Sequence, residues 1–211
     1  MRRYLMFFCL SLAVAPVLAA GSLADVQIHD RASGRTLPVY ESGGRWFVAG
    51  KPGNEYQVTV RNRAGGDLLA VVSVDGVNVV TGETAVASQS GYVIERGRAL
   101  SIKGWRKSLE KVAAFYFTDL GDSYAARTGR PDNVGVIGVA LFKRKPEPVL
   151  ELEQPQNRGG AGAAADSAAR SAAPHGAEKS IGTGHGRSEA SHARYVAFER
   201  ESDTPKESLN K

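Results

Sequence analysis

Cysteine is almost missing from this chain. Its 211 residues include a single cysteine, Cys9, which lies in an apolar N-terminal segment. If that segment is removed, no disulfide bond, thiol nucleophile or cysteine metal site is available. Three of the four histidines, His175, His185 and His192, lack metal-ligand spacing, and no H-E-x-x-H motif occurs. The sequence therefore predicts neither a metal nor a cofactor.

Strong charge of one sign is missing as well. The chain carries 27 Lys and Arg against 22 Asp and Glu, a formal net charge of +5. The only dense basic run is Lys143-Arg144-Lys145. Nucleic-acid binding usually needs a larger basic footprint, so no nucleic-acid partner is predicted.

Only the first 20 residues form a long apolar run. Met1-Arg2-Arg3 is positively charged, Tyr4 to Leu18 is apolar, and "VLAAG" at 17–21 supplies small residues for cleavage after Ala19 or one position later. This three-part pattern predicts a signal peptide over residues 1–20. The alternative is an uncleaved membrane anchor, but a spanning helix needs about 20 apolar residues. We therefore expect export to the periplasm or cell envelope and no transmembrane span in the mature chain.

Long helical patterns are absent from residues 22–147, and short strand patterns fill this region instead. "EYQVTVRN" at 55–62 alternates apolar and polar residues with period two, as a half-buried strand does. Turn pairs such as Pro52-Gly53 and Asp75-Gly76 recur every eight to twelve residues. This rhythm predicts an all-β domain, an antiparallel β-sandwich of jelly-roll or immunoglobulin-like general form. The only helical feature expected is one turn over residues 123–127.

The composition changes after residue 147. Residues 148–180 are rich in Ala, Gly and Pro and cannot bury enough apolar surface to offset their ordering entropy, so a disordered linker is predicted. Residues 181–211 are mostly polar and predict a weakly structured tail. One strand is conceivable there, in "ARYVAFER" at 193–200. Within the tail, "GTGHG" lacks the Lys-Ser/Thr of a phosphate-binding P-loop.

The segment "SVDGVNVVTG" at 73–82 raises the first question of chemistry. Asp75-Gly76 between apolar runs is a strong hairpin signal, because both positions tolerate positive φ. Asn78 can form local bonds between its side chain and the backbone. A structural role is favoured, with a ligand role for Asp75 or Asn78 as the alternative.

The segment "KGWRKS" at 103–108 is the second candidate site. An exposed Trp105 flanked by Arg106 and Lys107 would stack on a sugar ring or meet an anionic polymer, with Tyr116 extending the platform. The alternative is a half-buried tryptophan whose neighbouring cations are solvated.

The segment "DLGDSYAARTGRPDN" at 119–133 is the third candidate site. Asp122, Tyr124 and Arg127 are candidate binding residues of a polar pocket. A hydrolase using Asp119, Asp122 or Ser123 is less favoured. Ser123 would need a histidine base, residues 22–147 offer only His29, and no G-x-S-x-G elbow is present. A loop held by Asp–Arg pairs is the structural alternative.

Several runs together resemble a family of uncharacterised exported proteins of proteobacteria: "SVDGVNVVTGETA", "SGYVI", "GWRKSLEKVAAFYFTDLGDSYAARTGRPDNVGVIGVALF" and "IGTGHGRSE…FER". The resemblance covers about residues 45–143 and 181–200. It implies export, and it implies no particular activity, cofactor or catalytic residue. The all-β pattern, without a thiol, a metal motif or a catalytic set, leads us to expect a non-enzymatic envelope module that binds a partner protein or has a structural role. The alternative is binding of a carbohydrate or cell-wall polymer through Trp105.

Overall fold

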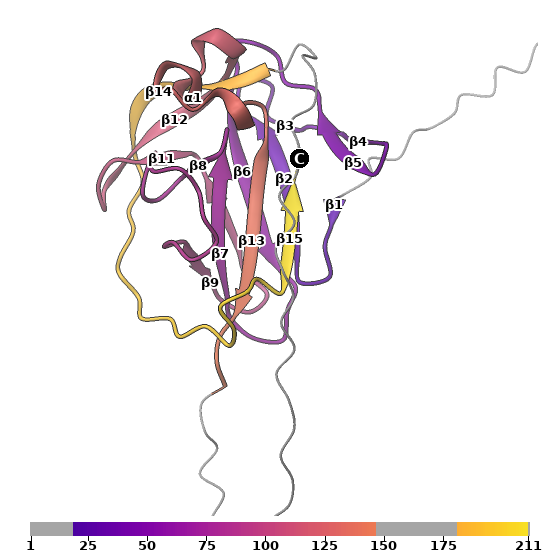
Figure 1. The fold of residues 1–211 in the computed structure, drawn as a ribbon, viewed down its shortest axis with the longest axis vertical. Helices are drawn as coiled ribbons and strands as arrows, with labels where there is room; N and C mark the ends of the chain where they lie inside the picture. Colours follow the sequence, from indigo (N-terminus) through magenta and orange to yellow (C-terminus); the bar gives the residue numbers. More distant parts are fainter. Residues whose placement is uncertain (1–18, 147–180, 211) are drawn as a thin grey trace, which may run out of the picture.

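The computed structural model describes residues 19–146 and 181–210, and the described chain is almost entirely β. Two antiparallel sheets face each other, which confirms the predicted all-β sandwich (Figure 1). Most of the predicted signal peptide and all of the predicted linker lie outside the described residues. No helix in the described ranges is long and apolar enough to cross a membrane.

The first sheet brings together strands from both ends of the chain. Its order is β1-β2-β6-β12-β11, with β3 beside β2, β10 beside β6 and β14 beside β12. Its strands are β1 (Ala19–Ala20), β2 (Ala24–Asp30), β3 (Arg35–Thr36), β6 (Glu55–Asn62), β10 (Ala99–Ile102), β11 (Gly104–Arg106), β12 (Lys111–Asp119) and β14 (Ile181–Ala190).

The second sheet has the order β15-β13-β7-β8, with β9 also beside β7. Its strands are β7 (Leu68–Val74), β8 (Val77–Asn78), β9 (Tyr92–Ile94), β13 (Ile137–Lys143) and β15 (Glu207–Asn210). A separate hairpin pairs β4 (Val39–Ser42) with β5 (Arg45–Val48). Three short helical turns follow β12: η1 (Leu120–Asp122), α1 (Tyr124–Arg127) and η2 (Pro131–Asn133). Helix α1 matches the helical turn predicted over residues 123–127, whereas η1 and η2 were not predicted.

The core lies between the two sheets and follows from the hydrophobic pattern of the strands. Tyr56, Val58 and Val60 of β6 alternate inward and are fully buried. In β7 six of the seven side chains are buried, because the central strand is covered on both faces. Burial of this apolar surface is the main stabilising term for a domain without disulfide bonds.

The predicted weakly structured tail is wrong, and so is the domain boundary at residue 147. Residues 181–190 form β14, which pairs with β12 along its length, and residues 207–210 form β15, which pairs with β13. The strand predicted at 193–200 does not form; apart from a single bridge at Arg200, this segment has no strand pairing. The sandwich therefore includes residues 181–210.

Glycines explain why the tail looked unstructured. A Cβ at Gly182 would lie 2.6 Å from Ser123 Cβ and Val134 Cγ1, and one at Gly186 would lie 2.7 Å from Ala114 O. These glycines therefore serve close packing of β14 against its neighbours, a use of glycine that composition does not distinguish from flexibility.

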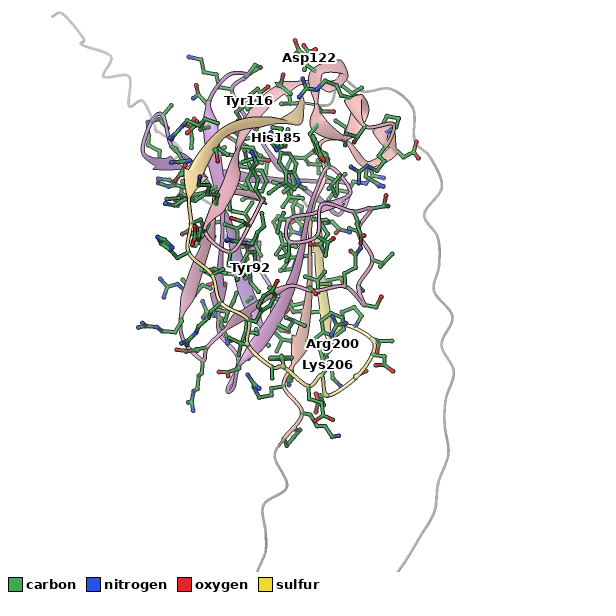
Figure 2. The ribbon with its side chains drawn as sticks, turned by 90° about the vertical axis from the view of Figure 1, so that its left-hand side faces the viewer. Tyr92, Tyr116, Asp122, His185, Arg200 and Lys206 are labelled. Carbon is green, nitrogen blue, oxygen red and sulfur yellow. The ribbon has the colours of Figure 1, made fainter. Side chains whose placement is uncertain are left out.

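Residues 191–200, here called the strap, connect β14 to the end of the second sheet. The strap runs down the open side of the sandwich from β14, past Tyr92, to Arg200 (Figure 2). Ser191 N donates to Glu110 O and Ala193 N to Leu109 O, both at 2.7 Å. At the other end, Lys145 N donates to Glu199 O at 2.9 Å. The strap is thus fastened to one sheet at its start and to the other at its end.

Candidate ligand groove

The Asp75-Gly76 turn has a structural role. Both residues have positive φ, 53° and 72°, as the predicted hairpin requires. The Asp75 carboxylate is 1% exposed and accepts hydrogen bonds from Gly135 N at 2.9 Å and Thr183 N at 2.6 Å. The hydrogen-bond donors to this carboxylate are therefore backbone N–H groups of the same chain. Burial raises the pKa of Asp75 to about 6.

Asn78 is likewise committed to the fold. Its Oδ1 accepts a hydrogen bond from Val80 N at 2.7 Å, and its Nδ2 donates to Gln89 Oε1 and Ser90 O. The side chain is fully buried and organises the loop between β8 and β9. The structural reading of both polar residues is thus favoured over a ligand role.

The predicted Trp105 platform is wrong. Trp105 is 3% exposed and packs edge-on against Phe115, with ring centroids 4.8 Å apart. It lies on the inward face of β11, where "GW" begins a strand that pairs with β12. A buried indole cannot stack on a polymer in solvent, so the sugar-binding hypothesis needs another aromatic residue.

The flanking cations differ in their surroundings. Arg106 Nε donates to the Tyr92 hydroxyl at 2.9 Å, and its Nη1 donates to Ser191 O at 2.8 Å. Lys107 has an exposed side chain without an ion-pair or hydrogen-bond partner among the described residues. Tyr116 lies against Gly184 of β14, on the outer face of the first sheet.

The 119–133 segment does not form a catalytic set. Ser123 is fully buried, and its Oγ accepts a hydrogen bond from Ala126 N at 3.1 Å, as the N-cap of α1. Asp119 and Asp122 are exposed. Figure 2 shows Asp122 at the top of the molecule, away from Tyr92. Within residues 19–146 and 181–210 no cluster of His, Cys, Asp or Glu could hold a metal ion.

Two predicted site residues do come together, around a histidine that sequence reasoning set aside. The ring of Tyr124 lies 5.2 Å from Trp105 and 5.3 Å from His185. Burial lowers the pKa of His185, and the charges of Lys107 and Arg127 lower it further. His185 is therefore mostly neutral at pH 7, and its half-buried ring lies against Trp105 and Tyr124.

A groove lies beneath the strap, between the two sheets. It has a volume of about 900 Å³, within the range of about 300–1,000 Å³ typical of ligand sites. Its walls are β9 and the loop before it from one sheet, and β10 and β11 from the other, with the strap across the opening. Hydroxyl groups are frequent in the lining: Thr81, Ser88, Ser90, Tyr92, Ser101, Ser108, Ser191 and Tyr195.

Cationic side chains outnumber acidic ones in this groove. The acidic residues are Asp67, which pairs with Arg144 at 3.3 Å, and Glu95. Arg106 and Arg200 donate to backbone carbonyl oxygens, and neither has a carboxylate partner in the described part of the chain. Lys103 pairs with Glu189 of β14 at 3.2 Å. The cations in the lining are Lys103, Arg106, Lys107, Arg144, Arg194 and Arg200.

The strap also presents the aromatic surface that Trp105 does not. Tyr195 is 89% exposed and Val196 is 50% exposed. The side chain of Arg194, beside them, has no hydrogen-bond or ion-pair partner within the described chain. Sequence reasoning missed these residues because "ARYVAFER" resembles a strand, in which one face would be buried. Comparisons with known protein families, with functionally described proteins and with solved structures find no match.

Proposed function

We propose that this chain is an exported, non-enzymatic module of the bacterial cell envelope that binds an anionic polymer in the strap groove. The observation that carries the proposal is a set of groove cations without a carboxylate partner among the described residues: Arg106, Lys107, Arg194 and Arg200. A polymer with carboxylate or phosphate groups would neutralise charges that the fold itself leaves without carboxylate partners.

The lining favours a hydroxylated polymer over a compact metabolite. Serine and threonine hydroxyls on both walls can donate to and accept from sugar hydroxyls. The exposed ring of Tyr195 offers a face for a sugar ring, and Lys107 and Arg194 are free to meet its anionic groups. Each contact is weak alone, so a repeating ligand that engages several of them would bind best.

The proposed mechanism is binding without chemistry. The hydroxyl of Ser123 serves as a helix cap and the carboxylate of Asp75 is held by two backbone N–H groups. Both groups make hydrogen bonds within the fold, which supports a role in holding or organising a surface polymer and not in catalysis.

Calorimetric titration of the mature chain with polygalacturonate, an anionic polysaccharide, tests the proposal. Binding should weaken as salt is raised, because screened charges contribute less. Tyr195→Ala and the double variant Lys107→Gln with Arg194→Gln should each weaken binding about tenfold. Tyr40→Ala and Arg35→Gln alter an exposed tyrosine and an exposed arginine away from the groove and are matched controls that should bind as the unmodified chain does.

Two further outcomes would overturn the proposal. Equal binding of uncharged dextran would remove the role of the cations. Tight binding of polyglutamate with no binding of the polysaccharide would make the partner an acidic protein segment, the protein-interaction role expected from the sequence.

A further inference from the structure

The second site of interest is on the other side of the sandwich, where the predicted leader meets the folded domain. Strand β1 pairs with β2, and in this register Ala20 lies opposite Asp25. Figure 1 shows β1, β2 and β15 on the side of the molecule away from the strap. The predicted cleavage, after Ala19 or one residue later, would therefore leave a new chain end at this point.

Asp25 is an unusual carboxylate for such a place. It is 5% exposed, and its Oδ2 accepts a hydrogen bond from Arg63 Nη1 at 2.8 Å. Its Oδ1 is buried without a hydrogen-bond partner among the described residues. A buried carboxylate oxygen without a donor is costly, and native structures rarely leave one so.

Glu207 supplies a second carboxylate at the same end of the chain. From β15 of the other sheet, its Oε1 accepts from Ser22 N at 2.6 Å and its Oε2 from Leu23 N at 2.7 Å. A Cβ at residue 21 would overlap Glu207 Oε1, so any other residue at this position would displace the carboxylate. Residues 21–23 are thus bound to both sheets through backbone groups.

We propose that removal of the leader creates an α-ammonium group that pairs with Asp25 and Glu207 and fastens the mature N-terminus across the two sheets. The inference rests on the proposed export. An endopeptidase adds water to the peptide bond: the leader keeps the new carboxylate, and the mature chain keeps the amino group. That amine is protonated at neutral pH, because its usual pKa is about 7.7–8.0.

The charges around the new chain end favour this pairing. Arg63 already pairs with Asp25 Oδ2 and its side chain is 57% exposed, and Arg61 lies opposite Asp25 in the register of β2 and β6. Asp25 and Glu207 together bring two negative charges to residues 20–23, and Asp25 Oδ1 still has no donor among the described residues, so an ammonium group would find an acceptor there. Cleavage after Ala19 leaves Ala20 as the first residue, opposite Asp25, and cleavage after Ala20 leaves Gly21, which directly precedes the two residues whose N–H groups donate to Glu207. Either position offers a carboxylate.

Thermal unfolding of two forms of the mature chain tests the inference. One form has a free N-terminus and the other is identical but Nα-acetylated, which removes the charge and keeps the backbone. At pH 7 the free form should melt about 2–4 °C higher, a shift typical of one good interaction in a chain of this size. Asp25→Asn and Glu207→Gln should each reduce the difference, whereas Glu201→Gln, on the segment that precedes β15, should preserve it.

Failure of this inference is distinguishable from failure of the proposed export. N-terminal sequencing of the protein recovered from the periplasm first reports whether and where the leader is cut. A chain cut at the predicted position whose free and acetylated forms melt alike would overturn the N-terminal pairing alone. A chain that keeps its leader, or is cut well inside the domain, would overturn both.

Discussion

The carboxylate of Asp75 accepts a hydrogen bond from the backbone N–H of Thr183 at 2.6 Å, which joins the β7–β8 turn to β14. A second bond, from Gly135 N at 2.9 Å, joins the same carboxylate to the loop before β13. Thr183 Oγ1 in turn lies 2.6 Å from the Tyr56 hydroxyl, in the core. One buried acid thus connects three segments that are far apart in the sequence.

Protonation of Asp75 should make the stability of the protein depend on pH. Burial raises its pKa in the folded state to about 6, above the usual 3.8. The stability linked to this proton is fully present below pH 3.8 and is lost as pH rises through about 6. The loss amounts to about 3 kcal/mol for a shift of this size. Urea unfolding of the unmodified chain and of Asp75→Asn, between pH 4 and 7.5, measures it.

The comparison with Asp75→Asn isolates this residue from other acids. Asparagine keeps one carbonyl oxygen and tolerates positive φ, but it does not titrate. Ion-paired Glu55 has a lowered pKa and affects stability at lower pH in both proteins. The difference between the two stability curves should therefore change between pH 4 and 6.5. A constant difference would contradict the raised pKa.

Packing of β14 should be sensitive to a single methyl group at residue 182. In Gly182→Ala the new Cβ would lie 2.6 Å from Ser123 Cβ and Val134 Cγ1, both held in place by buried surroundings. Overpacking of this kind costs about 1–3 kcal/mol. Chemical denaturation measures the loss, and Gly66→Ala, where a Cβ meets no atom within 4 Å, should be close to neutral. Equal stability of the two variants would show that β14 does not pack as described.

The fluorescence of Trp105 should be that of an indole shielded from water. In Trp46→Phe, where it is the only tryptophan, fluorescence emission should be blue-shifted and resist quenching by iodide, because the indole is 3% exposed. Urea should move the emission to longer wavelength. In the converse variant, Trp105→Phe, the half-buried Trp46 should be quenched more readily. Ready quenching of Trp105 by iodide would contradict its burial and would support the surface platform expected from the sequence.

The sequence allowed prediction of the sandwich because its strands carry local signals. The alternation around Tyr56 and the positive-φ pair Asp75-Gly76 each depend on a few neighbouring residues. The same locality limited the prediction for β14, since Gly182 and Gly186 are explained only by Ser123 and Ala114, which are distant in sequence. Glycine patterns in a strand buried by tertiary packing look the same as those of a flexible tail.

The candidate site could be predicted only in part for a related reason. Arg106 and Lys107 were identified from their sequence, but the partners that define the groove, Tyr92 and Ser191, come from other elements. Burial of Trp105 depends on how β11 faces the core, and a three-residue strand between polar neighbours gives little indication of that.

The strap should open when its arginine anchor is removed. Arg106 donates to Ser191 O at 2.8 Å and to Ser191 Oγ at 3.1 Å. Among the described residues no backbone–backbone hydrogen bond holds residues 194–198, which are contacted by the Arg144 side chain at Ala197 O and Phe198. In Arg106→Gln these charge-assisted bonds are lost, which should raise the open population of the strap about tenfold.

Limited trypsin digestion, followed by mass spectrometry, should then detect faster cleavage after the exposed Arg194. Arg96→Gln, also exposed but outside the groove, is the control. If both variants are cut at the rate of the unmodified chain, Arg106 does not fasten the strap, and access to the groove depends on its other end, where Arg200 donates to the carbonyl oxygens of residues 87–89.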